Sequence, residues 1–368
     1  MNKPTILRQS WRPPFCPNPN CKYHRILDGR WPFKRQGVYY RAVKPHCIQR
    51  FQCTDCRRSF STQTFSTRYW LKRPDVLPRL FMKTVGGMAN RQIARDLGVA
   101  PSTVDRQLAR LGRHCLLYQT RLLERCRPRG AVVVDGFETF EYSQYFPFHH
   151  NLAVEAESSF AFGFTDSPLR RKGRMRPDQK KRRAELEERW GRPDPRAVEK
   201  GVRELLRIVC RGLDRLELRS DDHPAYPRAM RPLKVRFAHR ITPSTARRDA
   251  DNDLFEVNLL DLLIRHSSAN HRRETIAWSK RRNASALRLW ILVVWRNCVK
   301  RRHEKGPPVS PAMLKGLTDR LLRVPEILSE RLFRTRIELP ASWATTYAGE
   351  VETPALGNNR RHSLAYAA

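Results

Sequence analysis

Two stripes of apolar residues at helical spacing, separated by a glycine, lie between residues 89 and 111. The apolar positions of the two stripes are Ile93, Ala94 and Leu97, then Val104, Leu108 and Leu111. Gly98 can adopt a left-handed backbone at a sharp turn, and Pro101 suits the first position of a helix. The pattern predicts a helix-turn-helix, although an ordinary helical hairpin has the same apolar spacing.

From residue 131 the chain has short runs rich in β-branched and aromatic residues. Four such runs lie at residues 131–135, 137–142, 152–156 and 159–164, each bounded by turn residues. Together they predict three antiparallel strands. The next predicted elements are a helix near 197–212, a strand at 215–219, a helix or turn at 227–230, a strand at 234–238 and a long helix from about 253. The order is therefore three strands, helix, strand, helix, strand and helix.

The last of these helices has one narrow polar stripe. Asn258, Asp261 and Arg265 fall within about 60° of one another around the helix axis. Most of the remaining circumference is apolar, with Leu254, Val257, Leu259, Leu260, Leu262, Leu263 and Ile264. This pattern predicts a buried helix whose polar stripe faces a polar site.

Charge narrows the class of partner. The 368 residues include 72 Lys and Arg against 36 Asp and Glu, which gives a net charge of +36 and a pI of about 10.9. The length predicts two or three domains, and 40% hydrophobic residues suffice for a sizeable core, which excludes wholesale disorder. Such an excess of cations predicts a polyanionic partner, either nucleic acid or an anionic membrane.

The apolar runs are too short for a membrane-spanning helix, which excludes the membrane alternative. The longest strongly apolar run, at residues 289–295, is far shorter than the roughly 20 residues that span a bilayer. The basic, proline-containing N-terminus lacks the apolar stretch of a secretory signal. We therefore expect a cytosolic protein that binds nucleic acid and has no membrane partner.

Four of the nine cysteines lie in the first 56 residues as two close pairs, namely Cys16 with Cys21 and Cys53 with Cys56. Two such short loops can direct four thiolates at one tetrahedral ion, which predicts a zinc ribbon. The competing ligands are His24, His46 and Cys47. Buried reduced thiols are the alternative, since an odd number of cysteines in a long, non-secreted chain argues against a disulfide framework.

Polar residues at the start of the second helix of the helix-turn-helix would reach base edges, namely Ser102, Thr103, Arg106 and Gln107. Arg106, Arg110 and Arg113 would contact phosphates along one side of that helix, or else form a solvated face. The basic stretch 170–192 is expected to be either a solvated helix or an arm over DNA.

The predicted order of elements matches the ribonuclease H-like fold, in which the first and fourth strands are neighbours. Asp135 ends the first predicted strand and Asp221 follows the fourth, so this fold would bring the two carboxylates together. Two close carboxylates repel each other unless a cation binds, and hard oxygen ligands select Mg²⁺ or Mn²⁺.

A third acid is expected from the last helix. Asp261 is preferred because it lies on the polar stripe, and an ion pair with Arg265 one turn on is compatible with that role. Glu256 projects about 140° away from Asp261, but 34 residues separate it from Asp221, an interval familiar in this fold. Glu274 would project like Glu256 and lie roughly 20 Å further along the axis.

These motifs resemble those of bacterial insertion-sequence transposases of the DDE class, nearest to the insertion-sequence-one-like group. In that family the second acid stands in an Asp-Gly-x-Pro-x-Tyr setting. Residues 221–226 read Asp-Asp-His-Pro-Ala-Tyr, a match that selects Asp221 over Asp222.

The last helix of that family carries Glu, then Asn, then Arg, and a Ser-Lys pair follows. This chain has Asn258, Asp261 and Arg265 in that register, followed by Ser279 and Lys280. The acid therefore stands one turn further along the same stripe than in the family.

The resemblance covers roughly residues 14–300 and implies a multidomain α+β protein. The implied parts are a zinc ribbon (1–66), an all-α helix-turn-helix domain (67–127), a ribonuclease H-like α/β domain with a mixed five-stranded sheet (128–304, with a basic insert near 168–195) and an extension of unknown role (305–368).

The resemblance implies a DNA transposase that binds the terminal inverted repeats of an insertion sequence and performs Mg²⁺-dependent cleavage and strand transfer. Asp135, Asp221 and Asp261 would hold Mg²⁺ or Mn²⁺, and the four cysteines would hold Zn²⁺. The implied partners are double-stranded DNA, as transposon ends and target, and further copies of the chain on DNA at the nucleoid. The alternatives are an inactive DNA-binding regulator and a nuclease on the same fold.

Overall fold

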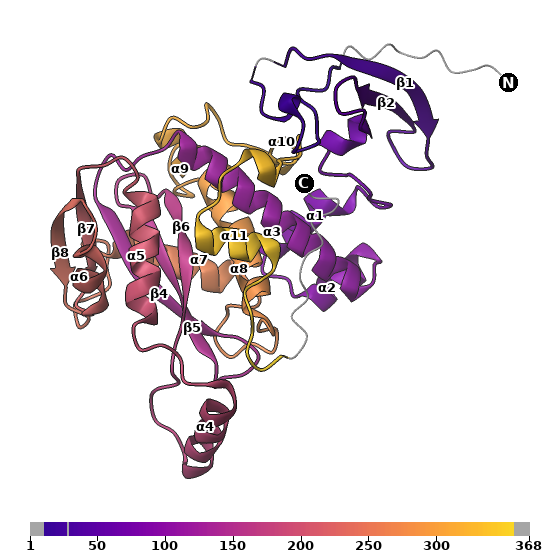
Figure 1. The fold of residues 1–368 in the computed structure, drawn as a ribbon. Helices are drawn as coiled ribbons and strands as arrows, with labels where there is room; N and C mark the ends of the chain where they lie inside the picture. The colour runs from indigo at the N-terminus through magenta and orange to yellow at the C-terminus, as the bar shows by residue number, and fades with distance from the viewer. Residues whose placement is uncertain (1–10, 28, 357–368) are drawn as a thin grey trace. The chain divides into compact units, whose positions relative to one another are not determined.

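The computed structural model describes residues 11–27 and 29–356. Residues 1–10 of the predicted N-terminal module and 357–368 of the predicted extension lie outside the described residues. The chain forms two compact units, residues 11–74 with Leu328–Glu338, and Asp75–Ile327 with residues 339–356. Each unit holds one β-sheet, so the protein is of the mixed α/β type (Figure 1).

The first unit is built on a three-stranded antiparallel sheet in the order β1-β2-β3. Its elements are β1 (Phe33–Tyr40), β2 (Cys47–Cys53), β3 (Ser59–Ser61) and short 3-10 helices at Lys22–His24 and Thr62–Phe65. Trp31, Phe51 and Phe60 are buried and stack through Phe60, with ring centroids 5.8 and 5.6 Å apart. Units this small usually need further stabilisation by a metal or disulfides.

A segment from the C-terminal region, Leu328–Glu338, completes the aromatic core of the first unit. Phe333 is 2% exposed, and its ring centroid lies 5.1 Å from that of Phe15 and 5.5 Å from that of Phe65. The Arg336 guanidinium lies 3.8 Å from the centroid of the Phe15 ring and donates hydrogen bonds to two carbonyls of the N-terminal segment. Part of the C-terminal extension, for which the sequence predicts no role, is thus built into the N-terminal unit.

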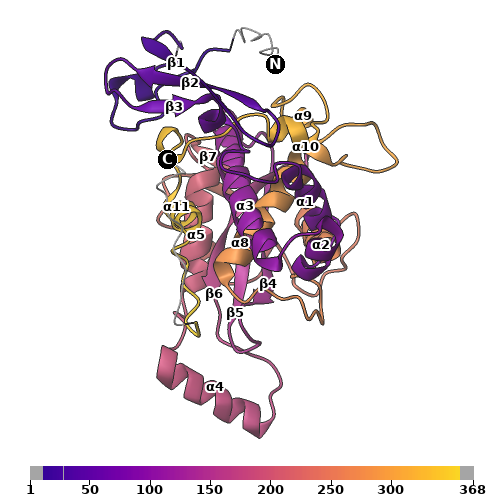
Figure 2. The same cartoon turned by 90° about the vertical axis from the view of Figure 1, so that its right-hand side faces the viewer.

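The second unit begins with α1 (Val76–Val85), α2 (Asn90–Leu97) and α3 (Pro101–Glu124). The turn between α2 and α3 has the geometry expected from its residues, because Gly98 has a φ of 61° and Pro101 is the first residue of α3. All six apolar positions of the two predicted stripes are buried. The long α3 packs along α8 (Arg282–Val294), which joins these helices to the rest of the second unit (Figure 2).

Gly112 marks the close crossing of α3 and α8, and we expect Gly112→Ala to destabilise the second unit. A Cβ at this position would lie 2.5 Å from the carbonyl oxygen of Leu287 and 2.6 Å from its Cβ. Overpacking of this kind costs about 1–3 kcal/mol of unfolding free energy, measurable by urea denaturation. Helix propensity alone would instead stabilise the variant by about 1 kcal/mol, so unchanged or raised stability would contradict the close crossing.

The second unit contains a five-stranded sheet in the order β6-β5-β4-β7-β8. Its strands are β4 (Val132–Phe140), β5 (Pro147–Glu155), β6 (Ala161–Pro168), β7 (Arg215–Asp221) and β8 (Arg236–Thr242). The first three are antiparallel neighbours, whereas β7 and β8 run parallel to β4. The runs 131–135 and 137–142 belong to one strand, because the backbone continues through Gly136 without a break.

Helices cover both faces of this sheet. The Thr165 hydroxyl donates to the carbonyl of Gly201 in α5 (Ala197–Val209), and the Phe164 ring packs 4.5 Å from that of Trp290 in α8. Because consecutive residues of a strand point to opposite faces, α5 and α8 lie on opposite sides of the sheet. On the α8 side, α7 (Phe255–Ser267) lies against β4 and β5.

The α7 helix is less buried than the sequence predicts. Val257, Leu260 and Ile264 are buried, but Leu262 is 66% exposed. The prediction of a helix buried all round is therefore wrong, because α7 packs on the sheet through one side only. The remaining helical elements are α4 (Pro177–Trp190), α6 (Ala225–Met230), a π-helical turn at Trp295–Val299, α9 (Pro311–Leu314), α10 (Val324–Ile327), a 3-10 turn at Arg334–Arg336 and α11 (Ala341–Ala348).

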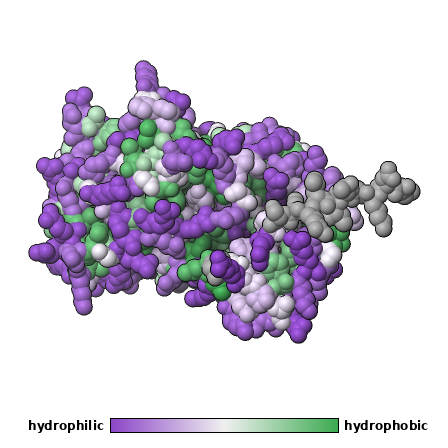
Figure 3. All heavy atoms as spheres, turned by 90° about the horizontal axis from the view of Figure 1, so that it is seen from above, coloured by the Kyte–Doolittle hydropathy of each residue, from purple (hydrophilic) through white to green (hydrophobic). Residues whose placement is uncertain are grey.

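Within the described part of the chain, every helix is too short or too polar to cross a membrane. Hydrophilic residues cover most of the face drawn in Figure 3, with hydrophobic residues between them. This surface agrees with the 29% of charged residues in the sequence.

Candidate metal centres

The first unit brings four cysteine sulfurs together. The Sγ atoms of Cys16 and Cys56 are 3.6 Å apart, those of Cys21 and Cys53 are 3.8 Å apart, and all four lie within 4.8 Å of one another. A tetrahedral ion with Zn–S bonds of about 2.3 Å needs sulfurs about 3.8 Å apart. The four side chains therefore have the spacing of a four-thiolate zinc site.

Turn hydrogen bonds hold each cysteine pair. The amide of Cys21 donates to the carbonyl of Asn18 at 3.0 Å, and the amide of Cys53 donates to that of Arg58 at 3.0 Å. Burial raises the pKa of the Cys21 thiol to about 11. Burial also acts on Cys56, but hydrogen bonds from Asn18 and Arg58 and the neighbouring thiols outweigh it and lower its pKa to about 7.

None of the three competing ligands belongs to this group. Both ring nitrogens of His24 are used, Nδ1 at 2.8 Å from the carbonyl of Cys16 and Nε2 at 2.8 Å from the Thr335 hydroxyl. His46 is exposed and hydrogen-bonded to a backbone carbonyl, and Cys47 is exposed at the other end of β2 from Cys53. The four-cysteine set is the one that the structure gathers.

The second centre lies where β4 and β7 adjoin. Asp135 lies within β4, and Asp221 is the last residue of β7. Val133 pairs with Arg219, so two residues further along each strand Asp135 is level with Asp221. Neighbouring strands are about 4.8 Å apart, and residues at the same level point to the same face. The two carboxylates therefore adjoin on the face that α7 covers.

Asp261 approaches this pair from α7. Burial and then the charge of Asp135 raise the pKa of Asp261 to about 8. Burial also raises the pKa of Asp135, with a smaller contribution from Asp221. Asp135 and Asp261 thus share one poorly solvated region, in which two negative charges destabilise each other, and Asp221 adjoins Asp135 on the next strand.

The other two candidates for the third acid lie elsewhere. Glu256 forms an ion pair with Arg302, with 3.2 Å between Oε1 and Nη2. Glu274 is exposed beyond the end of α7, at a left-handed backbone position with a φ of 52°. Of the three, Asp261 is the one whose pKa the charge of Asp135 raises.

Arg265 does not neutralise Asp261 through an ion pair in the described structure. Its guanidinium lies 4.5 Å from the centroid of the Phe137 ring, and Nη1 donates to the carbonyl of His271 at 3.2 Å. One carboxylate oxygen of Asp261, Oδ1, is shielded from solvent and has no hydrogen-bond partner among the described residues. A buried acceptor without a partner is costly unless a cation or water satisfies it.

The donor set of the aspartate cluster, Asp135, Asp221 and Asp261, consists of oxygens only, which suits Mg²⁺ or Mn²⁺. Among residues 11–27 and 29–356, the cysteines are the one group of three or more potential ligands within 4.8 Å, so the aspartates are spaced more widely. It is therefore the donor chemistry and the unpartnered Oδ1 of Asp261, rather than the spacing, that suit a divalent cation.

The raised pKa values predict that the metal-free protein loses stability as pH rises. Asp261 titrates near pH 4 when unfolded but at about 8 when folded, so the folded state holds more protons between these values and its stability falls across that range. We expect the Tm in chelator to fall from pH 5 to pH 8 and Asp261→Asn to flatten this slope. Thermal melts at each pH measure it, and an equal slope in the variant would refute the shift.

Two residues of this centre were not among the predicted site residues, although one of them, Tyr226, is the Tyr of the motif at residues 221–226. Tyr226 is buried, and its hydroxyl donates to Oδ1 of Asp135 at 3.5 Å. Burial and the charges of Asp135 and Asp221 raise the pKa of Tyr226 well above its usual value, so it stays a donor. Arg248 is exposed in the loop between β8 and α7, and its charge lowers the pKa of both Asp135 and Asp261. An arginine in a long loop carries no sequence signal of such a position.

The residues predicted to contact DNA lie on the first turns of α3. Ser102 and Arg106 are exposed, Thr103 and Gln107 are half-buried, and so is Arg110. Beside them, Arg91 and Arg95 of α2 line a shallow hollow of about 430 Å³ at the turn. Arg113 lies further along α3, beside Tyr347, and burial lowers its pKa to about 10. Its side chain therefore packs within the second unit, and the prediction that it contacts a phosphate is wrong.

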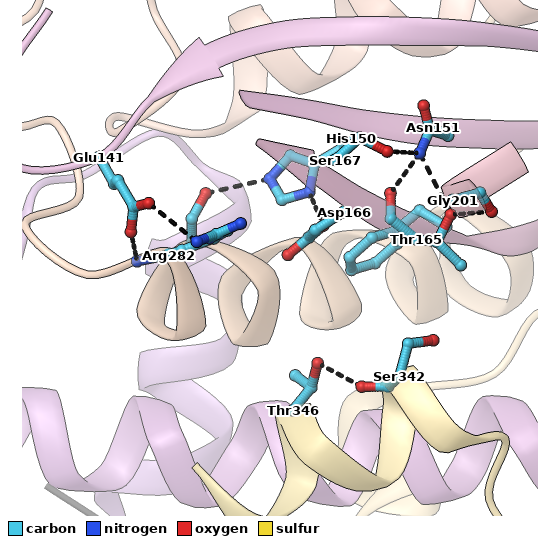
Figure 4. A network of polar contacts seen from close by, with 12 residues as sticks. Glu141, His150, Asn151, Thr165, Asp166, Ser167, Gly201, Arg282, Ser342 and Thr346 are labelled. Atoms are coloured by element: carbon cyan, nitrogen blue, oxygen red, sulfur yellow. Dashed lines mark hydrogen bonds and ion pairs between the residues drawn. The ribbon is translucent and has the colours of Figure 1, made fainter. Parts of the chain in front are cut away.

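A buried polar network between the sheet and α8 was also missed (Figure 4). Nδ1 of His150 lies 2.6 Å from Oδ1 of Asp166, and its Nε2 lies 3.1 Å from the hydroxyl of Ser285. The order of groups is that of a Ser-His-Asp triad, but Ser285 is 1% exposed and His150 is fully buried. Because no substrate reaches it, the network serves to join β5 and β6 to α8.

No family model matches the chain, and a search of curated proteins finds no similar sequence. Among solved structures, the chain is similar to one in a cryo-EM structure of the simian T-cell lymphotropic virus intasome in complex with PP2A regulatory subunit B56 gamma, at a TM-score of 0.23 and 15% identity. The match covers 54% of this chain and 58% of that one. A similarity at this level supports no inference about fold or function.

Proposed function

We propose that this protein is a DNA transposase that binds the ends of an insertion sequence and performs Mg²⁺-dependent cleavage and strand transfer. The observation that carries the proposal is the meeting of Asp135 and Asp221 on adjoining parallel strands with Asp261 from α7. Three antiparallel strands followed by two parallel ones support a ribonuclease H-like catalytic unit.

Asp135, Asp221 and Asp261 would hold Mg²⁺ or Mn²⁺. Bound there, the metal would supply activation of water or a 3′-hydroxyl and stabilisation of the leaving oxygen at a phosphodiester. Tyr226 fixes the orientation of the Asp135 carboxylate through its hydrogen bond. Arg248 is an exposed cation whose charge reaches both Asp135 and Asp261, and it suits a contact to a DNA phosphate.

DNA binding is assigned to the first unit and to α2 and α3. Zn²⁺ on the four cysteines would staple the first unit, whose sheet carries exposed basic side chains at Lys34 and Arg35. The exposed start of α3 would enter the major groove as the second helix of a helix-turn-helix. Pairing of two transposon ends implies several copies of the chain on DNA, at the nucleoid.

One observation favours a second function. The position that holds Glu in the resembled family holds Asn258 here, which would suit a DNA-binding regulator without catalysis. In that case the aspartate cluster would be a remnant, and the protein would bind DNA with the same surfaces.

The test uses purified protein, Mg²⁺ and labelled duplexes that carry the sequences flanking the gene on each side. We expect nicking at one position, followed by joining of the freed 3′-end to a second duplex. Binding without cleavage would establish the regulator, and cleavage without joining would establish a nuclease. Either result would overturn the transposase proposal.

The identity of the third acid can be tested separately. We expect Asp261→Asn to reduce cleavage at least about 100-fold, because several kcal/mol of metal-derived stabilisation depend on each ligand. Glu256→Gln and Glu274→Gln are the matched controls, and each should retain cleavage within a few-fold. A larger loss in Glu256→Gln than in Asp261→Asn would show that Glu256, and not Asp261, is the third acid.

A further inference from the structure

The helix α4 has no buried residue. In Figures 1 and 2 it stands away from the rest of the second unit, on two extended segments that leave β6 at Pro168 and return to α5 at Ala197. A short polar helix without tertiary packing adds little to stability in water. We therefore infer that this helix contacts a partner outside the chain.

Two contacts at its base nevertheless fix this helix to its supporting segment. Nε and Nη2 of Arg170 donate to the two carboxylate oxygens of Glu187, at 2.7 and 2.9 Å. Nη1 of Arg183 donates to the carbonyl of Arg171 at 3.0 Å. The segment 170–192, here named the basic arm, is thus a tethered structure rather than a loose loop.

The basic arm contains eleven Lys and Arg against four acids. Three of the acids are already paired within the arm, namely Asp178 with Arg176, Glu185 with Arg182 and Glu187 with Arg170 and Arg183. Arg174, Lys180 and Lys181 are exposed, and no acid lies within ion-pair distance of them in the described structure. The outward charge of the arm is therefore positive and unneutralised.

The arm leaves the sheet at the end toward which β4 and β7 run. Phe140 at the end of β4 pairs with Pro147, and Phe148 pairs with Pro168, where the arm begins. Asp135 lies five residues before Phe140, about 17 Å along the strand, and α4 spans about 21 Å. Duplex DNA rises about 3.4 Å per base pair, so the arm begins about five base pairs from the aspartate cluster.

From this placement we propose that the basic arm binds the phosphate backbone of double-stranded DNA on one side of the site of strand cleavage. The inference rests on the proposed function, because it takes the aspartate cluster as the point of cleavage. Duplex DNA fits the arm better than the same arm of a second copy, since each arm carries eleven Lys and Arg against four acids and two such arms repel each other. The contacts are with phosphates and carry no sequence preference.

The test compares the full chain with the triple variant Arg174→Gln, Lys180→Gln, Lys181→Gln. Binding to a fluorescein-labelled, mixed-sequence duplex of about 30 base pairs is followed by anisotropy over a series of KCl concentrations. Removal of each cation that neutralises a phosphate should flatten the plot of log K against log salt by about 0.9, so the slope should decrease in magnitude by up to about 2.7. The Tm should not change, because all three substituted side chains are exposed.

The matched control removes three exposed cations at the opposite end of the sheet, by Arg211→Gln, Lys234→Gln and Arg236→Gln. It loses the same net charge and should keep a slope close to that of the unaltered chain. Equal slopes for the arm variant and the unaltered chain would overturn the proposal. A changed oligomeric state with an unchanged slope would also overturn it, because the arm would then contact a second copy.

The position of the contact is tested on cleavable duplexes of decreasing length. When the flank ends within about five base pairs of the cut, the arm variant and the unaltered chain should bind equally. A difference that persists on the shortest duplex would overturn the placement. Failure of the unaltered chain to cleave would instead overturn the proposed function and leave the salt dependence of the arm measurable.

Discussion

Asp221→Asn is expected to abolish Mg²⁺-dependent DNA cleavage, with a loss of about 1,000-fold or more. Metal-based stabilisation of a phosphoryl transition state amounts to several kcal/mol, and each 1.36 kcal/mol is tenfold in rate. The substitution keeps the shape of the side chain and removes one carboxylate that faces Asp135. Cleavage of end-labelled duplex DNA in single-turnover conditions measures the effect.

The same variant should be more stable than the unaltered protein without metal. The charge of Asp221 contributes to the raised pKa of Asp135, so removal of that charge relieves repulsion in the folded state. A higher Tm together with abolished cleavage and retained DNA binding would exclude unfolding as the cause. Functional groups are often destabilising in this way.

Asp222→Asn is the matched control, because it removes the same charge one residue later. The Asp222 carboxylate accepts hydrogen bonds from the amide and hydroxyl of Ser244, at 3.3 and 3.4 Å. We expect cleavage to persist in this variant within a few-fold. Loss of cleavage in Asp222→Asn with activity retained in Asp221→Asn would reverse the assignment that the sequence motif favours.

Cys53→Ser is expected to remove zinc from the protein and to unfold the first unit. Structural zinc sites contribute about 10–16 kcal/mol in small modules, far more than an aromatic core of this size. Zinc content per chain should fall from about one to near zero, and the near-ultraviolet signal of the buried Trp31 should disappear. Metal analysis and circular dichroism of the full chain measure both effects.

Cys47→Ser is the control for this prediction. Cys47 is exposed and lies at the opposite end of β2 from Cys53, so its removal should leave zinc content unchanged. The second unit has its own core and should keep its thermal transition in both variants. Full zinc content in Cys53→Ser would exclude Cys53 as a ligand and refute the four-cysteine site.

Features that depend on neighbouring residues could be predicted from the sequence. The turn at Gly98 and the start of α3 at Pro101 follow from the backbone preferences of those two residues. The approximate strand positions and their order follow from short β-branched and aromatic runs. The cysteine quartet could be predicted because short loops hold each pair close whatever the rest of the chain does.

The choice among three candidate acids illustrates what local patterns leave open. Spacing along the chain placed Asp261 on a polar stripe but could not determine how α7 is rotated on the sheet. The buried contacts of Val257, Leu260 and Ile264 set that rotation, which turns Asp261 toward Asp135. The same rotation exposes Leu262, which its apolar character alone did not predict.

The sequence by itself determined the local conformations, the cysteine pairs and the strongly positive charge, since each depends on residues a few positions apart or on composition alone. The tertiary structure decided which distant groups meet. His24 is kept from the metal site because the Cys16 carbonyl and the hydroxyl of Thr335, far along the chain, occupy its two nitrogens. Phe333 completes a core that begins near residue 15. Burial and proximity of this kind depend on contacts between remote segments, and no local pattern encodes those contacts.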